Sequence, residues 1–158
     1  MSNENKIFQD ILNTAYFYLK FRPRTEKEMI NYLKNKGLKQ NWSDKLIQLV
    51  VEQLKDDRFI DDRKFIKQFV EERSLLKPKG IYVLKAELIR HGIRNDLIDE
   101  YFFEQTIDEE NLAYQAIIKR WDRLRILPGD KRFKRAMDFL LRRGFSFSIA
   151  KNVIKKLE

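Results

Sequence analysis

The chain contains no cysteine and only one histidine, His91. The absence of cysteine excludes a disulfide framework and thiolate ligands for a metal. No second histidine and no serine triad pattern accompanies His91, so we expect it near a helix end, where a cation interacts well with backbone carbonyls. The chain also lacks a glycine-rich phosphate loop, which argues against ATP hydrolysis. The sequence therefore predicts no catalytic residue, no cofactor and no enzymatic activity.

Glycine and proline are scarce, at five and three residues, a composition that favours helices over a turn-rich β protein. The longest unbroken apolar run, Ala15–Leu19, is far shorter than the roughly 20 residues that cross a bilayer. Residues 1–6 lack the basic segment and apolar block of a signal peptide. We therefore expect a soluble, cytoplasmic protein with no membrane partner.

One short pattern occurs three times: a leucine, three further residues, a glycine and an apolar residue. The copies are Leu33–Leu38, Leu88–Ile93 and Leu140–Phe145, and their glycines are 55 and 52 residues apart. A near-constant period of this size is typical of tandem helical units. Because glycine ends helices in the left-handed conformation, we expect a left-handed glycine in each copy. Three unrelated helix ends are the alternative.

Apolar residues at helical spacing predict three helices around each copy. The first helix is expected over residues 7–20, and Thr25 and Glu28 form a capping box at the start of the second. Further expected caps are Ser43, Asn95 and either Ser146 or Ser148, and the acids Asp108–Glu110 are well placed at a helix N-terminus. No segment has the pattern of a strand. We predict an all-α fold of three tandem three-helix repeats, with boundaries at 1–56, 57–105 and 106–158.

The net charge of +9 is unevenly distributed. Residues 1–56 carry a net charge of +3, residues 57–105 are balanced, and residues 106–158 carry +6. Positive ends of this kind suggest contact with a polyanion, and a solubilising surface charge is the alternative. The candidate contact residues are Arg22, Arg24, Lys27, Lys34 and Lys36 at one end, and Lys119, Arg120, Arg123, Lys131, Arg132, Lys134, Arg135, Arg142 and Arg143 at the other.

Spacing along one predicted helix arranges part of this second set. Lys131, Lys134 and Arg135 share one helical face. With Arg142 and Arg143 they could present a stripe to phosphates or to an acidic surface. A solvated helix face is the alternative.

Four aspartates, Asp56, Asp57, Asp61 and Asp62, could supply oxygen ligands for a metal. They straddle a predicted helix start, and two cations, Arg58 and Arg63, are interleaved with them. Carboxylates at such a place cap backbone amides and pair with neighbouring cations. We therefore expect capping and ion pairing, and no metal site.

Three aromatic residues, Trp42, Trp121 and Phe147, could stack on nucleic-acid bases. Aromatic residues at helix entries more often pack on the hydrophobic core. We favour the core for all three.

The ordered set of motifs in this chain resembles the RecX family. The motifs are Arg24–Glu28, Leu33–Gly37, Leu54–Phe65, Phe69–Arg73, Lys79–Gly80 and Arg142–Ser146. No single motif is highly specific, but together they span nearly the whole chain in the family's order. The chain departs from the family pattern at Ile66, where a small alanine is usual, and at Pro78.

The resemblance implies an elongated, curved helical solenoid that regulates the bacterial recombinase RecA without catalysis of its own. It implies binding to the RecA filament on single-stranded DNA, usually with inhibition of RecA ATP hydrolysis and strand exchange. Double-stranded DNA is a further candidate partner, and a monomer is expected. The alternative is a free-standing basic helical-repeat protein that binds DNA.

Overall fold

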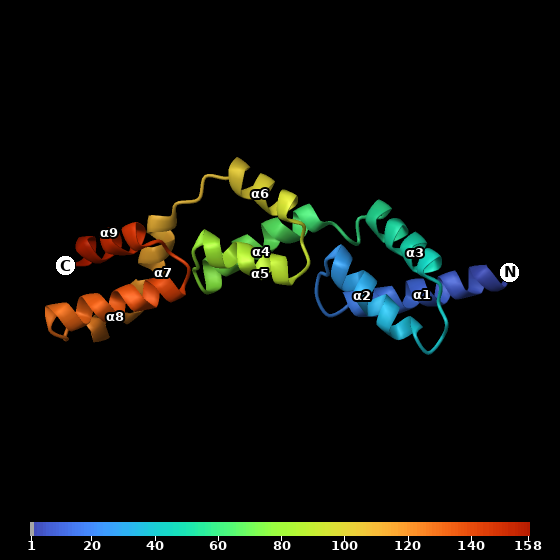
Figure 1. Ribbon diagram of the computed structural model, residues 1–158, viewed down its shortest axis with the longest axis horizontal. Coiled ribbons are helices and arrows are strands. Elements are labelled where there is room, and N and C mark those ends of the chain that lie inside the picture. The colour runs from blue at the N-terminus through green and yellow to red at the C-terminus, as the bar shows by residue number, and fades with distance from the viewer. Residues whose placement is uncertain (1) are drawn as a thin grey trace. The chain divides into compact units, whose positions relative to one another are not determined.

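The computed structural model describes residues 2–158, and within this range the chain forms nine α-helices and no β-strand (Figure 1). The helices are α1 (Asn3–Leu19), α2 (Glu26–Gly37), α3 (Asp44–Asp56), α4 (Asp62–Leu76), α5 (Ile81–Arg90), α6 (Asn95–Glu104), α7 (Glu109–Leu124), α8 (Gly129–Arg142) and α9 (Phe147–Leu157). The predicted all-α helical repeat fold is confirmed. No helix in this range is both long and apolar enough to cross a membrane.

The chain divides into two compact units. The first unit comprises the residues up to Ile66 together with Ile89–Leu97, and the second comprises Lys67–Leu88 and Ile98–Glu158. Helices α4, α5 and α6 therefore each contribute residues to both units.

The core of the first unit lies between α1, α2 and α3, which pack against one another (Figure 1). Their apolar residues recur at helical spacing, so each helix directs one stripe inward. The buried side chains are Ile11, Ala15, Met29, Leu33, Ile47, Val50, Val51, Leu54 and Ile60.

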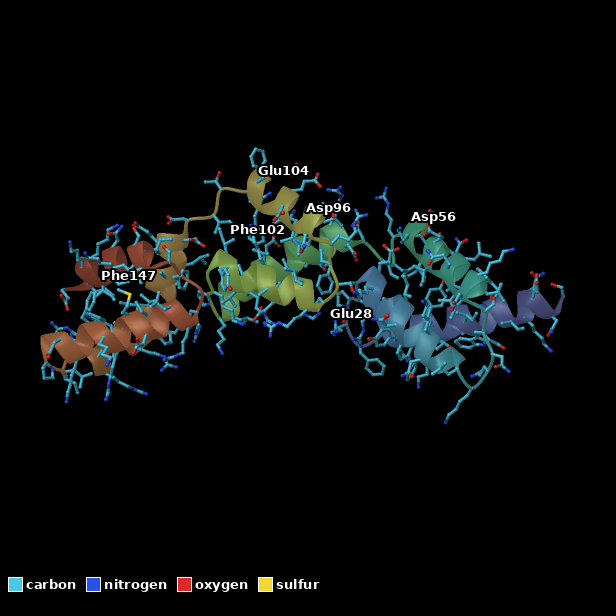
Figure 2. All side chains as sticks on the ribbon, in the orientation of Figure 1. Glu28, Asp56, Asp96, Phe102, Glu104 and Phe147 are labelled. Carbon is cyan, nitrogen blue, oxygen red and sulfur yellow. The ribbon has the colours of Figure 1, made fainter. Side chains whose placement is uncertain are left out.

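The second unit has an equivalent core between α7, α8 and α9. Its buried side chains are Ala113, Ala116, Ile117, Trp121, Ala136, Met137, Phe139, Leu140, Phe145, Ala150, Val153 and Ile154. The prediction that the aromatic residues pack on a core is confirmed for Trp121, and Trp42 packs partly buried on the first core. It is wrong for Phe147, which is 57% exposed, because this first residue of α9 precedes the buried turn at Ala150 (Figure 2).

Side-chain caps set the beginnings of several helices. Helix α1 begins at Asn3, four residues earlier than predicted, because the Ser2 hydroxyl accepts a hydrogen bond from the backbone N–H of Asn5 at 3.2 Å. Helix α6 begins at Asn95 itself, so the prediction that Asn95 precedes this helix as its cap is wrong. Two other predicted caps, Ser43 and Ser146, are confirmed by hydrogen bonds of 3.2 Å each, and Asp108, expected at a helix N-terminus, accepts from the Asn111 N–H at 3.0 Å.

Two of the three repeated glycines adopt the left-handed conformation. Gly92 has a φ of 85° and Gly144 a φ of 90°. The prediction is wrong for Gly37, which ends α2 without a positive φ, while Asn41 takes a φ of 53° four residues later. Gly37 is instead in close contact with Trp42: a Cβ there would lie 3.0 Å from the Trp42 Cβ, tighter than most such contacts.

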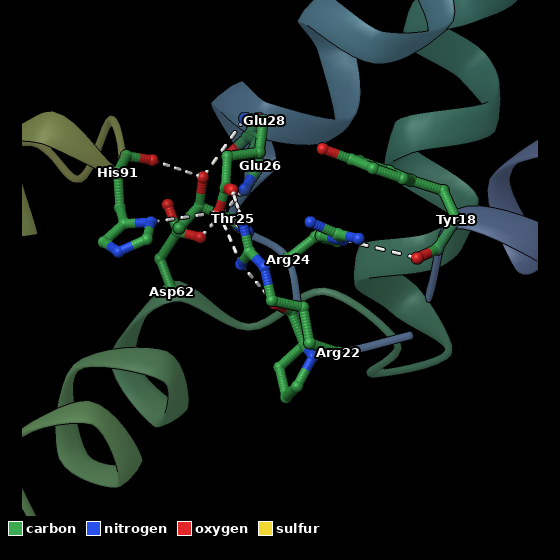
Figure 3. Close-up of polar contacts among 9 residues, drawn as sticks. Tyr18, Arg22, Arg24, Thr25, Glu26, Glu28, Asp62 and His91 are labelled. Atoms are coloured by element: carbon green, nitrogen blue, oxygen red, sulfur yellow. Dashed lines mark hydrogen bonds and ion pairs between the residues drawn. The ribbon is translucent and has the colours of Figure 1, made fainter. Parts of the chain in front are cut away.

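An interlocking joint connects the start of α2 to two later segments of the first unit (Figure 3). The Thr25 hydroxyl donates to the carbonyl of His91 at 2.6 Å, and the Glu26 N–H donates to Asp62 Oδ1 at 3.0 Å. Gly92 approaches Lys27 so closely that a Cβ would lie 2.7 Å from the Lys27 Cβ. His91 follows the last residue of α5, as its expected helix-end role requires.

The second unit contains an equivalent joint, which connects the start of α5 to Arg143 after α8 and to Glu109 at the start of α7. The Gly80 N–H donates to the carbonyl of Arg143 at 2.7 Å, and the Ile81 N–H donates to Glu109 Oε1 at 2.8 Å. In both joints the accepting carbonyl precedes a left-handed glycine, and the accepting carboxylate is the first residue of a helix. Carboxylates at these positions satisfy N–H groups that have no partner within their own helix.

The predicted capping box of α2 is confirmed and forms part of the first joint. The Glu28 N–H donates to the Thr25 hydroxyl, and the Thr25 N–H donates to Glu28 Oε1, both at 3.1 Å. Burial raises the pKa of the Glu28 carboxyl, but hydrogen bonds from Arg22 and from the Thr25 backbone outweigh this effect and lower the pKa below its ordinary value. Thr25 is fully buried.

Replacement of Thr25 by alanine tests the joint. Thr25→Ala removes the cap and leaves a part-buried carbonyl without its donor, so we expect a loss of about 2–3 kcal/mol in unfolding free energy. Ser43→Ala removes only an exposed cap and should cost about 1 kcal/mol. Urea denaturation of both variants measures the difference, and equal losses would show that the bond to His91 contributes nothing.

Replacement of Gly144 by valine tests the left-handed glycine of the second joint. A Cβ at Gly144 would lie 2.4 Å from Val83 Cγ2, and a β-branched residue resists this backbone conformation. We expect Gly144→Val to cost about 3 kcal/mol or more. Gly129→Ala is the control, because its Cβ would meet only Arg132 Nη2 at 3.7 Å. Its melting temperature should stay close to that of the unaltered chain, whereas similar losses in both variants would contradict the assignment.

Candidate anion-binding site

A cleft of about 320 Å³ lies in the second unit between α7 and the segment that joins α4 to α5. It is lined by Leu76, Lys77, Pro78, Gln115, Ala116, Lys119, Arg120, Arg123 and Arg143. Five of these residues are cationic and none is acidic. We call this feature the cationic cleft.

The amphipathic pattern of α7 explains how it presents these cations. Ala113, Ala116 and Ile117 direct one face of the helix into the core. Lys119 and Arg123, four residues apart, then lie together on the exposed side. Burial of the apolar stripe of α7 therefore determines which of its cations line the cleft.

Two arginines of the cleft share one aromatic ring. The guanidinium carbons of Arg120 and Arg143 lie 4.6 and 4.8 Å from the ring centroid of Phe139, which is 7% exposed. Arg143 also donates to the carbonyl of Pro78 at 3.3 Å. Stacking on the ring orients both guanidinium groups, and the hydrogen bond further fixes that of Arg143. Planar groups held in this way can bind an anion through two parallel hydrogen bonds.

The positive charge of the cationic cleft is not neutralised within the described part of the chain. None of its five cationic side chains forms an ion pair with residues 2–158. Burial, with the like charge of Arg120 as a further cause, lowers the pKa of the Arg143 guanidinium. An anion bound between these groups would relieve the repulsion.

Helix α8 carries a second group of the predicted residues on its exposed side. Lys131, Lys134, Arg135 and Arg142 are exposed and lie on one helical face, as their spacing predicts. Arg132 lies elsewhere on α8. It pairs with Glu158 at 2.9 Å and donates to the carbonyls of Arg125 and Leu127. The structure thus separates Arg132 from the stripe and gives it a role in holding the end of α9.

The five predicted cations of the first unit make separate contacts. Arg22 pairs with Glu28, and Arg24 stacks on Tyr18 at 3.7 Å and donates to its carbonyl. Lys27 lies against Gly92. The two remaining residues, Lys34 and Lys36, are exposed on α2, where Lys36 lies 5.7 Å from the ring of Tyr32.

Two of the four aspartates considered as metal ligands, Asp61 and Asp62, take part in helix capping. Asp61 Oδ1 accepts from the Lys64 N–H at 3.1 Å, and Asp62 accepts from the start of α2. Burial raises the pKa of the Asp62 carboxyl. Within residues 2–158, no three His, Cys, Asp or Glu side chains gather in a way that could hold a metal ion. The predicted ion pairing is wrong for Arg58, whose side chain forms no ion pair in this range.

Sequence reasoning missed Lys77 and the role of Phe139. Lys77 directly follows α4 and precedes Pro78, whose buried ring fixes the turn. The helix-breaking proline was a usable signal, because it brings the residue before it to a surface loop. Phe139 gave no signal, since its spacing indicates only a core residue.

Sequence models of three known domains match this chain in order. They are described as the first, second and third three-helix domains of RecX and match residues 12–54, 61–101 and 108–154, respectively.

Similar whole proteins carry the same family name. The regulatory protein RecX of Streptococcus agalactiae serotype Ia is 30% identical over 149 residues, which cover 92% of this chain and 55% of that protein. The regulatory protein RecX of Geobacillus thermodenitrificans is 27% identical over 148 residues, covering 90% and 54%. The chain therefore spans about half the length of these relatives.

Two crystal structures share the fold. RecX from Lactobacillus salivarius matches with a TM-score of 0.81 and 22% identity, over 95% of this chain and 96% of that one. A second regulatory protein RecX matches with a TM-score of 0.77 and 21% identity, over 94% and 73%. At these identities the likeness shows the helical architecture.

Removal of two cations from the cleft tests its ability to bind phosphates. Lys119→Gln with Arg123→Gln should weaken binding to a single-stranded oligonucleotide and make the slope of log affinity against log salt shallower by about 1.4, near 0.7 for each lost phosphate contact. Binding titrations at several salt concentrations measure this slope. Lys151→Gln with Lys155→Gln makes the same charge change on the exposed side of α9. Equal effects of the two pairs would show that the cleft has no special role.

Proposed function

This chain belongs to the RecX family, and from that premise we propose that it regulates RecA by binding the RecA filament on single-stranded DNA. In this proposal it lowers RecA ATP hydrolysis and strand exchange and catalyses no reaction itself. The observation that supports the proposal most strongly is the match of three RecX domains, in order, over residues 12–54, 61–101 and 108–154. The relatives are named regulatory proteins, which agrees with a role without chemistry.

The cationic cleft supports a contact with the DNA of such a filament. It offers five cations, no carboxylate and two arginines held on one ring. Planar guanidinium groups match the geometry of phosphate oxygens. The exposed face of α8 adds four cations in the same unit. Together these groups supply the phosphate contacts that position a protein on a nucleic acid.

A protein without catalytic groups lowers the activity of another protein by favouring one of its states. Binding shifts an equilibrium only by the difference in affinity for the two states. A coupling of about 1–3 kcal/mol changes an affinity roughly 5–150-fold. We therefore propose that this chain binds the less active state of the filament more tightly.

A RecA ATPase assay on single-stranded DNA tests the proposal. Added chain should reduce the steady-state rate of ATP hydrolysis in proportion to filament occupancy, and strand exchange should fall in parallel. The variant with Lys119→Gln and Arg123→Gln should need a higher concentration for the same effect. The pair at Lys151 and Lys155 on α9 should act as the unaltered chain does.

An unchanged ATPase rate at saturating chain, with no co-sedimentation with the filament, would refute the proposal. Co-sedimentation together with an increased rate of ATP hydrolysis would support RecA as the partner but would show that the chain stimulates it.

A free-standing DNA-binding protein is the second candidate function, because no residue of the described chain neutralises the positive charge of the cationic cleft. The two functions differ in their preferred partner. Tighter binding to the RecA filament than to the same bare oligonucleotide, at one salt concentration, favours the regulator. Equal affinities favour the free-standing DNA-binding protein.

A further inference from the structure

Arg58 has a left-handed backbone conformation, with a φ of 62°, just after the end of α3. The Arg58 N–H donates to the carbonyl of Lys55 at 3.0 Å, and the Phe59 N–H donates to the carbonyl of Leu54 at 2.8 Å. This pair of hydrogen bonds defines the Schellman motif, whose left-handed position is usually glycine. A residue with a Cβ is strained there.

The same chain uses glycine at the corresponding place after two other helices. Gly144 follows α8 in a matching pair of hydrogen bonds, and Gly92 occupies the equivalent position after α5. Glycine would remove the strain at Arg58 as well. Backbone strain that a sequence retains is often associated with a functional side chain.

No contact within the described chain accounts for the Arg58 side chain. Arg58 is exposed, and its guanidinium has no hydrogen bond, ion pair or ring contact with residues 2–158. The neighbouring Phe59, in contrast, packs edge-on against Tyr16 at 5.2 Å. The strain at Arg58 is therefore not offset by an interaction of its charged group inside the protein.

Arg58 lines a groove of about 740 Å³ that lies wholly within the first unit. The groove combines apolar residues with charges of both signs. Its other lining residues are Glu26, Lys27, Ile30, Lys55, Ile60, Asp61, Asp62, Arg63, Gly92, Arg94 and Leu97.

We propose that Arg58 is a partner-binding residue whose guanidinium binds a carboxylate on the surface of a protein partner. This inference rests on the proposed function, because the partner is then the protein part of the RecA filament. A bidentate contact with a carboxylate is among the strong interactions that a guanidinium can make with a protein surface. Arginine is also enriched among the residues that dominate binding energies at interfaces.

The charges of the groove favour a protein over a nucleic acid. Its lining places three carboxylates, on Glu26, Asp61 and Asp62, among five cations, whereas a row of phosphates fits best on a lining of cations alone. A surface with alternating charges and apolar side chains matches the mixed lining, and such complementarity selects the correct partner. The cationic cleft of the second unit, which has no carboxylate, differs from this groove in the kind of partner it suits.

Substitutions at Arg58 separate backbone strain from side-chain function. Arg58→Gly relieves the strain and removes the guanidinium, so we expect a melting temperature equal to or above that of the unaltered chain and filament binding at least about tenfold weaker. Arg58→Ala retains the strain and should lose binding to the same extent. Arg58→Lys keeps the charge without the planar fork and should bind with intermediate affinity. Lys45→Ala removes an equal charge from an exposed position on α3 and should bind normally.

The measurements are thermal melting and titration of RecA filaments, with bare single-stranded DNA as a second ligand. Unaltered binding by both Arg58→Gly and Arg58→Ala would overturn the proposal while leaving the proposed function intact. A parallel loss of stability and binding in Arg58→Gly would make Arg58 structural. An equal loss toward bare DNA would make its ligand a phosphate. Absence of filament binding by the unaltered chain would refute the proposed function, and this inference with it.

Discussion

The fold depends on one contact that occurs twice, once in each unit: a helix start closed by a carboxylate and by a carbonyl from later in the chain. Thr25 and Gly80 donate to carbonyls that precede left-handed glycines. Asp62 and Glu109 accept hydrogen bonds from the N–H groups of the next residues, Glu26 and Ile81, respectively. Three-helix sets near 50 residues bury only enough apolar surface for marginal stability alone. The joint therefore stabilises helix ends, in addition to the stabilisation of helix faces by the hydrophobic core.

Much of this architecture could be predicted from the sequence, because helical periodicity and capping are local properties. Thr25, Glu28 and Ser43 belong to short patterns whose geometry follows from the residues themselves. The prediction for Gly37 was wrong for a non-local reason. Gly92 and Gly144 take part in joints, whereas Gly37 is in close contact with the Trp42 side chain, where a small residue fits best. A glycine pattern alone does not distinguish these two requirements.

The cationic cleft was predictable only in part. The density of lysine and arginine on α7 indicated Lys119, Arg120 and Arg123, but the contribution of Lys77 depends on the folding of the α4–α5 segment against α7. Arg132 had the same sequence pattern as its neighbours, yet it binds Glu158 and two carbonyls. Charge can be counted in a sequence, but the availability of a charge depends on tertiary contacts.

The two tryptophans of the chain lie in different units, with Trp42 half-buried in the first and Trp121 buried in the second. Indole emission moves to longer wavelength when the ring meets water, so each unit carries its own intrinsic fluorophore. Replacing either tryptophan with phenylalanine leaves a chain whose fluorescence follows one half alone. Comparing the two unfolding curves would establish whether the halves melt as one cooperative body or in succession.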